Sequence, residues 1–351
     1  MVVIAGHTRL KAAIRLGLKQ IPVYIASDMT EEEAKAYRIA DNQTATISEW
    51  DEDLLAKQIA ELANVSFDLS SLGFDGKELD RLLDIANPPA QSDGECEILP
   101  PKVPVCKKGD RWILGDHVLL CGDARSPEDV AKLMGDEKAD MLLIDPPYGV
   151  AYVGKTEDHL EIQNDKLNPE ELTKFLSSSF KAVEPQLKKG AAFYVWHADN
   201  IRMPFLHAFE DCGWMVRQLL VWVKNVFTFG RQDYQWKHEP CFYGWIEGAP
   251  HTWLSGRNLS TVLEFNKPSK NDVHPTMKPV ALFEHLIKNS CNIKGIVLDV
   301  FCGSGTTVIA CQNTNRKARV MELDPAYCDV IIERWKQATG GTPVLDNDQA
   351  A

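Results

Sequence analysis

The chain from about residue 110 onward alternates short apolar runs with segments of helical periodicity. The runs are continuous rather than alternating, which is typical of strands in a parallel sheet covered by helices on both faces. This order predicts an α/β fold with a doubly wound, mostly parallel sheet. We expect its strands at residues 118–121, 141–144, 191–196, 216–223, 296–300 and 319–322, and its helices at 127–134, 169–187, 204–211, 279–289, 306–312 and 325–338.

A smaller segment with mixed signals comes first. Residues 2–5 and 21–26 are β-branched runs that predict strands, which makes this segment α+β. Four helices are expected there: one at 8–16, one that begins at the Thr30/Glu33 capping box, one capped by Asp51, and one at 77–85.

Residues 87–104 hold five prolines in eighteen positions and show no periodicity. Such a composition predicts a semi-rigid linker. We therefore expect an N-terminal domain at 1–86, a linker at 87–105, a larger domain at 106–338 and a flexible tail at 339–351.

Charge is unevenly distributed along the chain. The net charge is −12, of which residues 1–105 carry −8, whereas residues 215–290 carry +3 and four histidines. The average surface should repel a polyanion, so any contact with nucleic acid has to be local. The stretch 215–290, with its net positive charge, has a composition suited to local contact with nucleic acid.

The nine cysteines and the apolar runs bear on the compartment. No two cysteines form a CxxC pair, which favours reduced thiols over a zinc site or a disulfide framework. No apolar run approaches ~18–20 residues and no signal peptide is evident. We expect a cytoplasmic protein without a metal.

The first chemical motif is Asp145-Pro146-Pro147-Tyr148, directly after an apolar strand. Ligands of open α/β sheets bind at such strand ends. A carboxylate beside a rigidly held proline carbonyl offers two acceptors for an exocyclic amino group, and Tyr148 offers a face for stacking. The alternative is a plain strand-ending turn, since Asp-Pro-Pro also favours turns.

The second motif, Asp299-Val300-Phe301-Cys302-Gly303-Ser304-Gly305-Thr306-Thr307, lies between a strand and a helix. Glycines there allow a ligand to approach the backbone. Glu322 and Asp324 follow after the next strand, about where a ribose diol is held. The pair of features predicts a nucleoside-containing cofactor, and the missing third glycine argues against NAD.

Taken in this order, Asp-Pro-Pro-Tyr and then Phe-x-Gly-x-Gly resemble the β class of S-adenosylmethionine-dependent DNA amino-methyltransferases. The resemblance covers about residues 108–338. It is supported by the runs Cys121-Gly122-Asp123-Ala124, His238-Glu239-Pro240 and His274-Pro275-Thr276-Met277-Lys278-Pro279.

The resemblance implies a set of site residues. Asp145, Pro146, Pro147 and Tyr148 are expected to bind and activate the target base. Thr276 and Lys278 are expected beside the methionine carboxylate of the cofactor, and Asp123 at its adenine amine. The full cofactor set is Asp123, Ala124, Thr276, Lys278, Asp299, Phe301, Gly303, Ser304, Gly305, Thr306, Thr307, Glu322 and Asp324.

The implied reaction is methylation of adenine N6 in duplex DNA. Positioning of the amine lone pair behind the methyl group is the main contribution to such an in-line displacement, and the base must be flipped out of the helix. In this family Asp-Pro-Pro-Tyr favours adenine, whereas Ser-Pro-Pro favours cytosine N4. Cytosine N4 is the alternative substrate, and a homodimer is the state often found in the class.

Residues 222–253 contain nine aromatic side chains interleaved with basic ones. Basic groups contact phosphates, and arginine can contact guanine edges. The candidate target-recognition region is 225–272, with Arg231, Lys237, His238 and Arg257 as possible DNA contacts. The alternative for Phe242, Tyr243 and Trp245 is a core strand.

The N-terminal segment resembles a ParB/sulfiredoxin-type domain, through residues 5–13, 21–23 and 37–43. In that family a Gly-x-x-Arg turn can cradle nucleotide phosphates. Here the chain starts at the strand before Gly6, so we expect a truncated scaffold or DNA tether rather than a nucleotide site. Such fusions resemble those of phages and mobile elements. A hypothesis from another class is therefore a ParB-like DNA-binding protein with an inactive methyltransferase fold.

Overall fold

The computed structural model describes residues 3–47, 50–64, 67, 69–86, 98–148, 167–228, 233–266 and 277–346. Clustering of contacts divides the chain into two compact units, residues 1–55 and 56–351. The boundary falls within helix α3 (Glu52–Asn64). The four segments expected from the sequence (1–86, 87–105, 106–338 and 339–351) remain predictions, and residues 87–97 of the linker lie outside the described part.

The second unit is built on one sheet of ten strands in the order β10-β1-β2-β9-β8-β3-β4-β6-β5-β7. Its middle, from β2 to β4, is parallel, and β6 is antiparallel to both of its neighbours. The strands are β1 (Arg111–Leu114), β2 (His117–Cys121), β3 (Ala139–Ile144), β4 (Leu187–Trp196), β5 (Val216–Thr228), β6 (Trp236–Trp245), β7 (Val262–Glu264), β8 (Ile296–Asp299), β9 (Lys317–Glu322) and β10 (Val344–Leu345).

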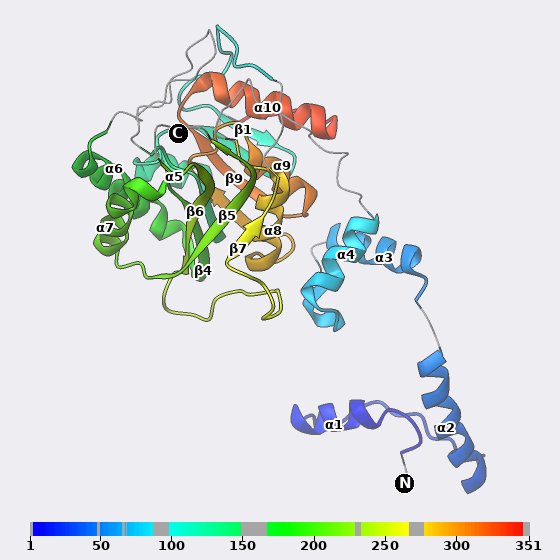
Figure 1. The fold of residues 1–351 in the computed structure, drawn as a ribbon. Helices are drawn as coiled ribbons and strands as arrows, with labels where there is room; N and C mark the ends of the chain where they lie inside the picture. Colours follow the sequence, from blue (N-terminus) through cyan, green and yellow to red (C-terminus); the bar gives the residue numbers. More distant parts are fainter. Residues whose placement is uncertain are drawn as a thin grey trace. The chain divides into compact units, whose positions relative to one another are not determined.

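Helices cover both faces of this sheet, as the continuous apolar runs predict (Figure 1). Successive side chains of a strand point to opposite faces. Met141 and Leu143 accordingly pack with side chains of α8 to α10, whereas Leu142 and Ile144 pack with those of α5 to α7. The helices are α5 (Pro127–Met134), α6 (Pro169–Val183), α7 (Arg202–Cys212), α8 (Val280–Ser290), α9 (Thr306–Asn313) and α10 (Pro325–Thr339).

The predicted doubly wound α/β fold is confirmed, and each of its six predicted strands and six predicted helices is present. Asn168 forms a capping box with Glu171 at the start of α6. The short strands β1, β7 and β10 were not predicted, because two to four residues carry too little periodicity. For residues 242–245 the core-strand alternative holds, since they lie in β6 and Phe242 and Tyr243 are buried.

The N-terminal part is helical over its described residues, with α1 (His7–Arg15), α2 (Glu31–Ile47), α3 and α4 (Gly76–Ala86). Thr30 and Glu33 form the expected capping box, and Asp51 caps α3. The strands expected at 2–5 and 21–26 are not found in the described residues, and the α+β prediction for this part is wrong there. Tyr24 is 93% exposed. A β-branched run forms a strand only when a neighbouring strand pairs with it.

No helix among the described ranges is both long and apolar enough to span a membrane.

Candidate active site

Four acidic residues stand at the carboxyl ends of four neighbouring parallel strands. Asp123 follows β2, Glu322 ends β9, Asp299 ends β8, and Asp145 follows β3, and these strands are adjacent in that order. Two sequence motifs separated by more than 150 positions therefore meet at one edge of the sheet. Open α/β sheets bind their ligands at this edge.

Asp145 and Tyr148 form a compact pair at the end of β3. The Tyr148 hydroxyl donates a 2.6 Å hydrogen bond to Asp145 Oδ1. Burial and the nearby Asp145 charge raise the pKa of Tyr148 well above its ordinary value, so the phenol stays protonated. Its ring meets Phe205 edge to face at 6.5 Å. Each carboxylate oxygen still has a lone pair available for a further donor.

Lys278 has different partners from those expected. Its ammonium forms ion pairs with Asp145 and with Glu239, and it lies 3.3 Å from the Tyr148 hydroxyl. Burial by itself would lower the pKa of Lys278, but the two carboxylates outweigh it and raise the pKa. The lysine is therefore a buried cation that binds the Asp145 carboxylate. A role beside the methionine carboxylate remains an untested prediction, and Thr276 lies outside the described residues.

Glu239 and Lys224 are functional candidates that were assigned no role from the sequence, although Glu239 was noted within the run His238-Glu239-Pro240. The Lys224 ammonium forms an ion pair with Glu239, which also binds Lys278. Burial would raise the pKa of Glu239, yet the two lysines lower it. The sequence did hold a signal for them, because each is an ionisable residue next to the apolar stretch of its strand. An ionisable side chain is buried only when it pairs with a partner of opposite charge.

The glycine loop after β8 is held by Asp299. Its Oδ1 accepts a hydrogen bond from the Phe301 amide, and its Oδ2 accepts one from the Thr307 hydroxyl. Gly305 adopts a φ of +89°, and a Cβ at this position would lie 3.2 Å from Ile331. Both the backbone conformation and the space therefore require glycine here.

Glu322 ties the same loop to the next strand. Its carboxylate accepts the amide hydrogens of Gly303 at 2.8 Å and Asp324 at 2.9 Å. Asp324 in turn caps α10. The Asp123 carboxylate is paired with the Arg125 guanidinium, which lowers the pKa of Asp123, and Ala124 beside it is buried.

The remaining hydroxyl groups of the loop are buried. Arg334 binds the Ser304 carbonyl at 2.9 Å and the Thr306 hydroxyl at 3.4 Å, and Thr307 binds Asp299. Contact of Ser304, Thr306 and Thr307 with the cofactor remains a prediction, and Thr306 and Thr307 already have partners within the protein.

The edge of the sheet where Asp299 and Glu322 lie fits a cofactor that carries hydroxyl groups and a positive charge. Burial raises the pKa of both Asp299 and Glu322 to about 7. Two buried carboxyl groups on adjacent strands are stabilised by a bound cation and by hydroxyl donors. A nucleoside with a cationic substituent supplies both.

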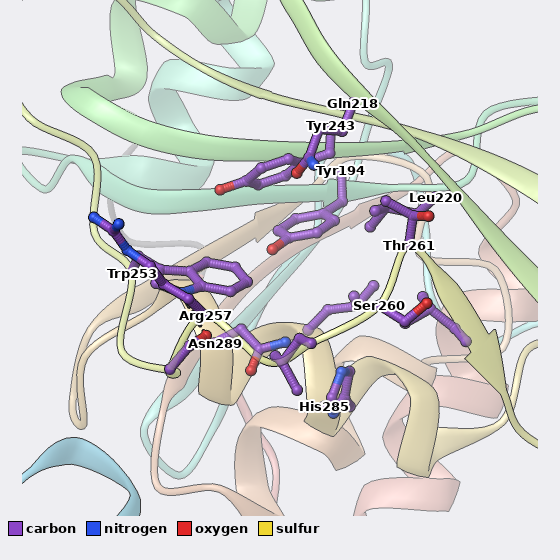
Figure 2. A pocket seen from close by; sticks show the side chains of 14 residues that line it. Tyr194, Gln218, Leu220, Tyr243, Trp253, Arg257, Ser260, Thr261, His285 and Asn289 are labelled. Carbon is purple, nitrogen blue, oxygen red and sulfur yellow. Dashed lines mark hydrogen bonds between the residues drawn. The ribbon is translucent and has the colours of Figure 1, made fainter.

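The predicted DNA contacts are dispersed. Lys237 is exposed and His238 half-buried at the start of β6, whereas Arg231 lies outside the described residues. Arg257 lies elsewhere, at a cavity of about 280 Å³ between the sheet and α8. Figure 2 shows Arg257 and Trp253 on one side of it, Tyr194 and Tyr243 above, and Asn289 and His285 on the helix below. The structure thus does not bring Arg257 to the Asp145 site.

Comparison with known proteins identifies two segments. Residues 249–333 match the N6/N4 DNA methylase family, and residues 53–108 match the ParB-methyltransferase HTH domain. The ParB relationship is thus confirmed, but its matched segment is a helix-turn-helix domain that runs through the whole of the expected linker. The residues that suggested a nucleotide-cradling turn, 5–13, lie before it.

Several curated proteins are similar over most of their own length. "Putative methylase YubD" of Escherichia coli (strain K12) is 32% identical over 191 residues, which is 54% of this chain and 78% of YubD. Type II methyltransferase M.HpaI of Haemophilus parainfluenzae is 25% identical over 255 residues, covering 66% of this chain and 78% of that protein.

Solved structures of DNA methyltransferases also align. The M1.HpyAVI–SAM complex covers 62% of this chain and 98% of its own, at 23% identity and a TM-score of 0.47. The cytosine-N4-specific PvuII DNA methyltransferase covers 68% and 96%, at 16% identity and a TM-score of 0.47.

The family determines the cofactor and the general substrate, which are S-adenosyl-L-methionine and DNA. The chain belongs to the N6/N4 family of DNA methylases and carries a ParB-methyltransferase HTH domain ahead of its methylase domain.

Proposed function

We propose that this protein methylates adenine N6 in duplex DNA, with Asp145, Pro146, Pro147 and Tyr148 holding the flipped base. The observation that carries the proposal is the Asp145–Tyr148 pair, in which a carboxylate and an aromatic ring are fixed together at the end of β3. One relative, named DNA adenine methyltransferase YhdJ of Escherichia coli (strain K12), is 26% identical over 262 residues and has 83% of its length covered.

In this proposal, residues of the chain bind and orient the amino group of the target base. S-adenosyl-L-methionine supplies an activated methyl group on a positively charged sulfur. Asp145 and the Pro146 carbonyl accept the two amine hydrogens, which directs the nitrogen lone pair out of the ring plane. Stacking on Tyr148 offsets ~1–3 kcal/mol of the cost of unstacking the base. Asp145 then accepts the proton that the methylated amine loses.

We also propose that the glycine loop and its neighbours hold the cofactor. In this proposal Glu322 accepts the ribose hydroxyls, and Asp299, Phe301, Gly303 and Gly305 form the adjacent wall. The finer assignments follow the same edge of the sheet, with Asp123, Ala124 and Asp324 towards the adenine and Lys278, Thr276, Ser304, Thr306 and Thr307 towards the other end.

The identity of the methylated base is tested with methyl-labelled cofactor and two sets of duplexes. One set has no adenine in one strand, and the other has no cytosine in one strand. We expect label in N6-methyladenine after hydrolysis to nucleosides. Label in N4-methylcytosine would show instead that the alternative, cytosine N4, is the substrate. DNA binding without any incorporation would instead favour the hypothesis of an inactive methyltransferase fold.

Cofactor affinity should depend on pH through Glu322 and Asp299. Since burial raises the pKa of both to about 7, they are protonated below that pH, become weaker acceptors for hydroxyl groups and no longer balance a cation. Calorimetric titration should show affinity for S-adenosyl-L-methionine weakening by up to about tenfold per pH unit and titrating group below pH 7.

The unliganded protein should show the opposite trend. The folded state retains protons that the unfolded chain releases, so these two groups lower the free energy of unfolding as pH rises from about 4 to about 7. Glu322→Gln should flatten the affinity profile, whereas Glu333→Gln on the exposed side of α10 should leave it unchanged. An affinity independent of pH between 5.5 and 8 in wild type would refute the assignment.

A further inference from the structure

Two buried lysines and two half-buried carboxylates form a continuous row across the edge of the sheet. Lys224 binds Glu239, Glu239 lies 3.4 Å from the Lys278 ammonium, and Lys278 binds Asp145. These residues come from β5, β6, the segment before α8 and the end of β3. We call them the charge relay.

The relay is balanced and largely shielded from water. The side chain of Lys278 is 2% exposed and that of Lys224 9%, and the two carboxylates are 22% and 25% exposed. Each ammonium also lies over an aromatic ring, Lys278 over Trp196 and Lys224 over Trp222, both at 5.2 Å. Two cations and two anions cancel, so removal of any one member leaves an uncompensated buried charge.

Glu239 controls how Lys278 is shared. With Glu239 present, the ammonium interacts with two carboxylates, and Asp145 keeps part of its capacity as an acceptor. Without Glu239 the lysine would be drawn to Asp145 alone, and the carboxylate would become a weaker acceptor for an incoming amine.

The far end of the relay lies within the β hairpin formed by β5 and β6. In the β5–β6 pair, Trp222 is opposite Glu239 and Val223 is opposite His238. The exposed Lys237 lies two residues before Glu239 on the same side of β6, and Trp236 and His238 are in ring contact at 5.6 Å. Side chains of the chemistry that binds DNA, Lys237 on one face of β6 and Trp236 with His238 on the other, are thus on the same strand as Glu239.

We propose that Lys224 and Glu239 are positioning residues that couple contact of the β5–β6 hairpin with its DNA target to the position and charge of Asp145. The inference rests on the proposed role of Asp145. When the hairpin sits as in this structure, Glu239 holds Lys278 between the two carboxylates. A DNA that displaces the hairpin moves Glu239 and leaves Asp145 neutralised by Lys278. Target recognition then changes the rate of methyl transfer as well as binding.

The test compares Glu239→Gln and Lys224→Met with wild type, in the full chain. The substrates are a duplex with the methylated site mapped for wild type and a duplex with one neighbouring base pair changed. We expect Glu239→Gln to lower kcat on the mapped site by about 5- to 150-fold, the range of ordinary coupling between sites. The KM for S-adenosyl-L-methionine should stay within about threefold, and the kcat ratio between the two duplexes should fall towards one. Lys224→Met leaves Glu239 to bind Lys278 more strongly and draws that lysine away from Asp145, so this variant should not lower kcat.

The matched control is Glu247→Gln. It removes the Arg217–Glu247 ion pair at the opposite end of the same two strands, and should leave both kcat and the ratio unchanged. Glu239→Asp retains the carboxylate and should recover part of the ratio. If Glu239→Gln does not fold, the balanced double variant Lys224→Met/Glu239→Gln takes its place.

An unchanged kcat in Glu239→Gln, or a loss in that variant that is equal on both duplexes, would overturn the coupling. This outcome is distinct from failure of the proposed function, because the ratio can be measured on whichever base wild type methylates. Full activity of an Asp145 variant would instead show that the proposed role of Asp145 is wrong.

Discussion

Replacement of Asp145 by alanine should lower kcat for methyl transfer by about 10²–10⁴-fold, the range expected for loss of a positioned proton acceptor. The variant loses the carboxylate that we assign to the target amine, while Glu322 and the glycine loop stay in place. Cofactor affinity should therefore remain close to that of wild type. Single-turnover rates with saturating DNA, together with calorimetric cofactor binding, measure the two quantities separately.

A matched control lies at the other end of the same strand. Asp140 on β3 pairs with Lys188 and accepts the Ile296 amide, away from the catalytic edge. Asp140→Asn keeps an acceptor oxygen and should retain wild-type kcat. Asp145→Asn, which preserves size but not charge, should behave like Asp145→Ala. Wild-type activity in both Asp145 variants would show that Asp145 has no role in the reaction.

Replacement of Lys278 by methionine should affect both stability and activity. The substitution leaves Asp145 and Glu239 with only Lys224 to compensate them, and removal of one partner from a buried ion pair lowers the free energy of unfolding by about 3–5 kcal/mol. We also expect a loss of kcat similar to that of Asp145→Ala, because Asp145 loses the cation that holds it. Denaturant unfolding and steady-state kinetics at low temperature measure the two effects.

The same variant separates two assignments of Lys278. The sequence resemblance places this lysine beside the cofactor, whereas its observed ion pair is with Asp145. A fall in kcat with the KM for S-adenosyl-L-methionine within about threefold would support the Asp145 role. A rise of more than about tenfold in this KM with kcat retained would support the cofactor role. Lys294→Met, which removes the surface pair with Asp116, should change neither.

Much of the fold could be predicted because its signals are local. The strands of the parallel core are continuous apolar runs, and α6 and α10 begin at a capping residue followed by proline. Asp145 and the glycine loop each follow such a strand directly. Since ligands bind at strand ends in this fold class, the two motifs were expected at one edge of the sheet before their spatial relation was known.

The charge relay could not be predicted in this way. Glu239 reaches Lys278 only because β6 runs antiparallel between β4 and β5, and no local pattern specifies that insertion. The N-terminal strands failed for a related reason, because pairing depends on a partner strand and not on β propensity alone. Arg257 was grouped with Lys237 by proximity in sequence, yet it lies at the cavity beside α8.

The sequence by itself determined the order of strands and helices, the two motifs and the class of chemistry they imply, since periodicity, capping and strand-end positions are properties of neighbouring residues. Only the tertiary structure decided which charges meet. Lys278 and Asp145 are 133 positions apart, and their contact depends on how distant strands pair. In a buried site the partner of a charge determines its role, because water is not there to replace that partner.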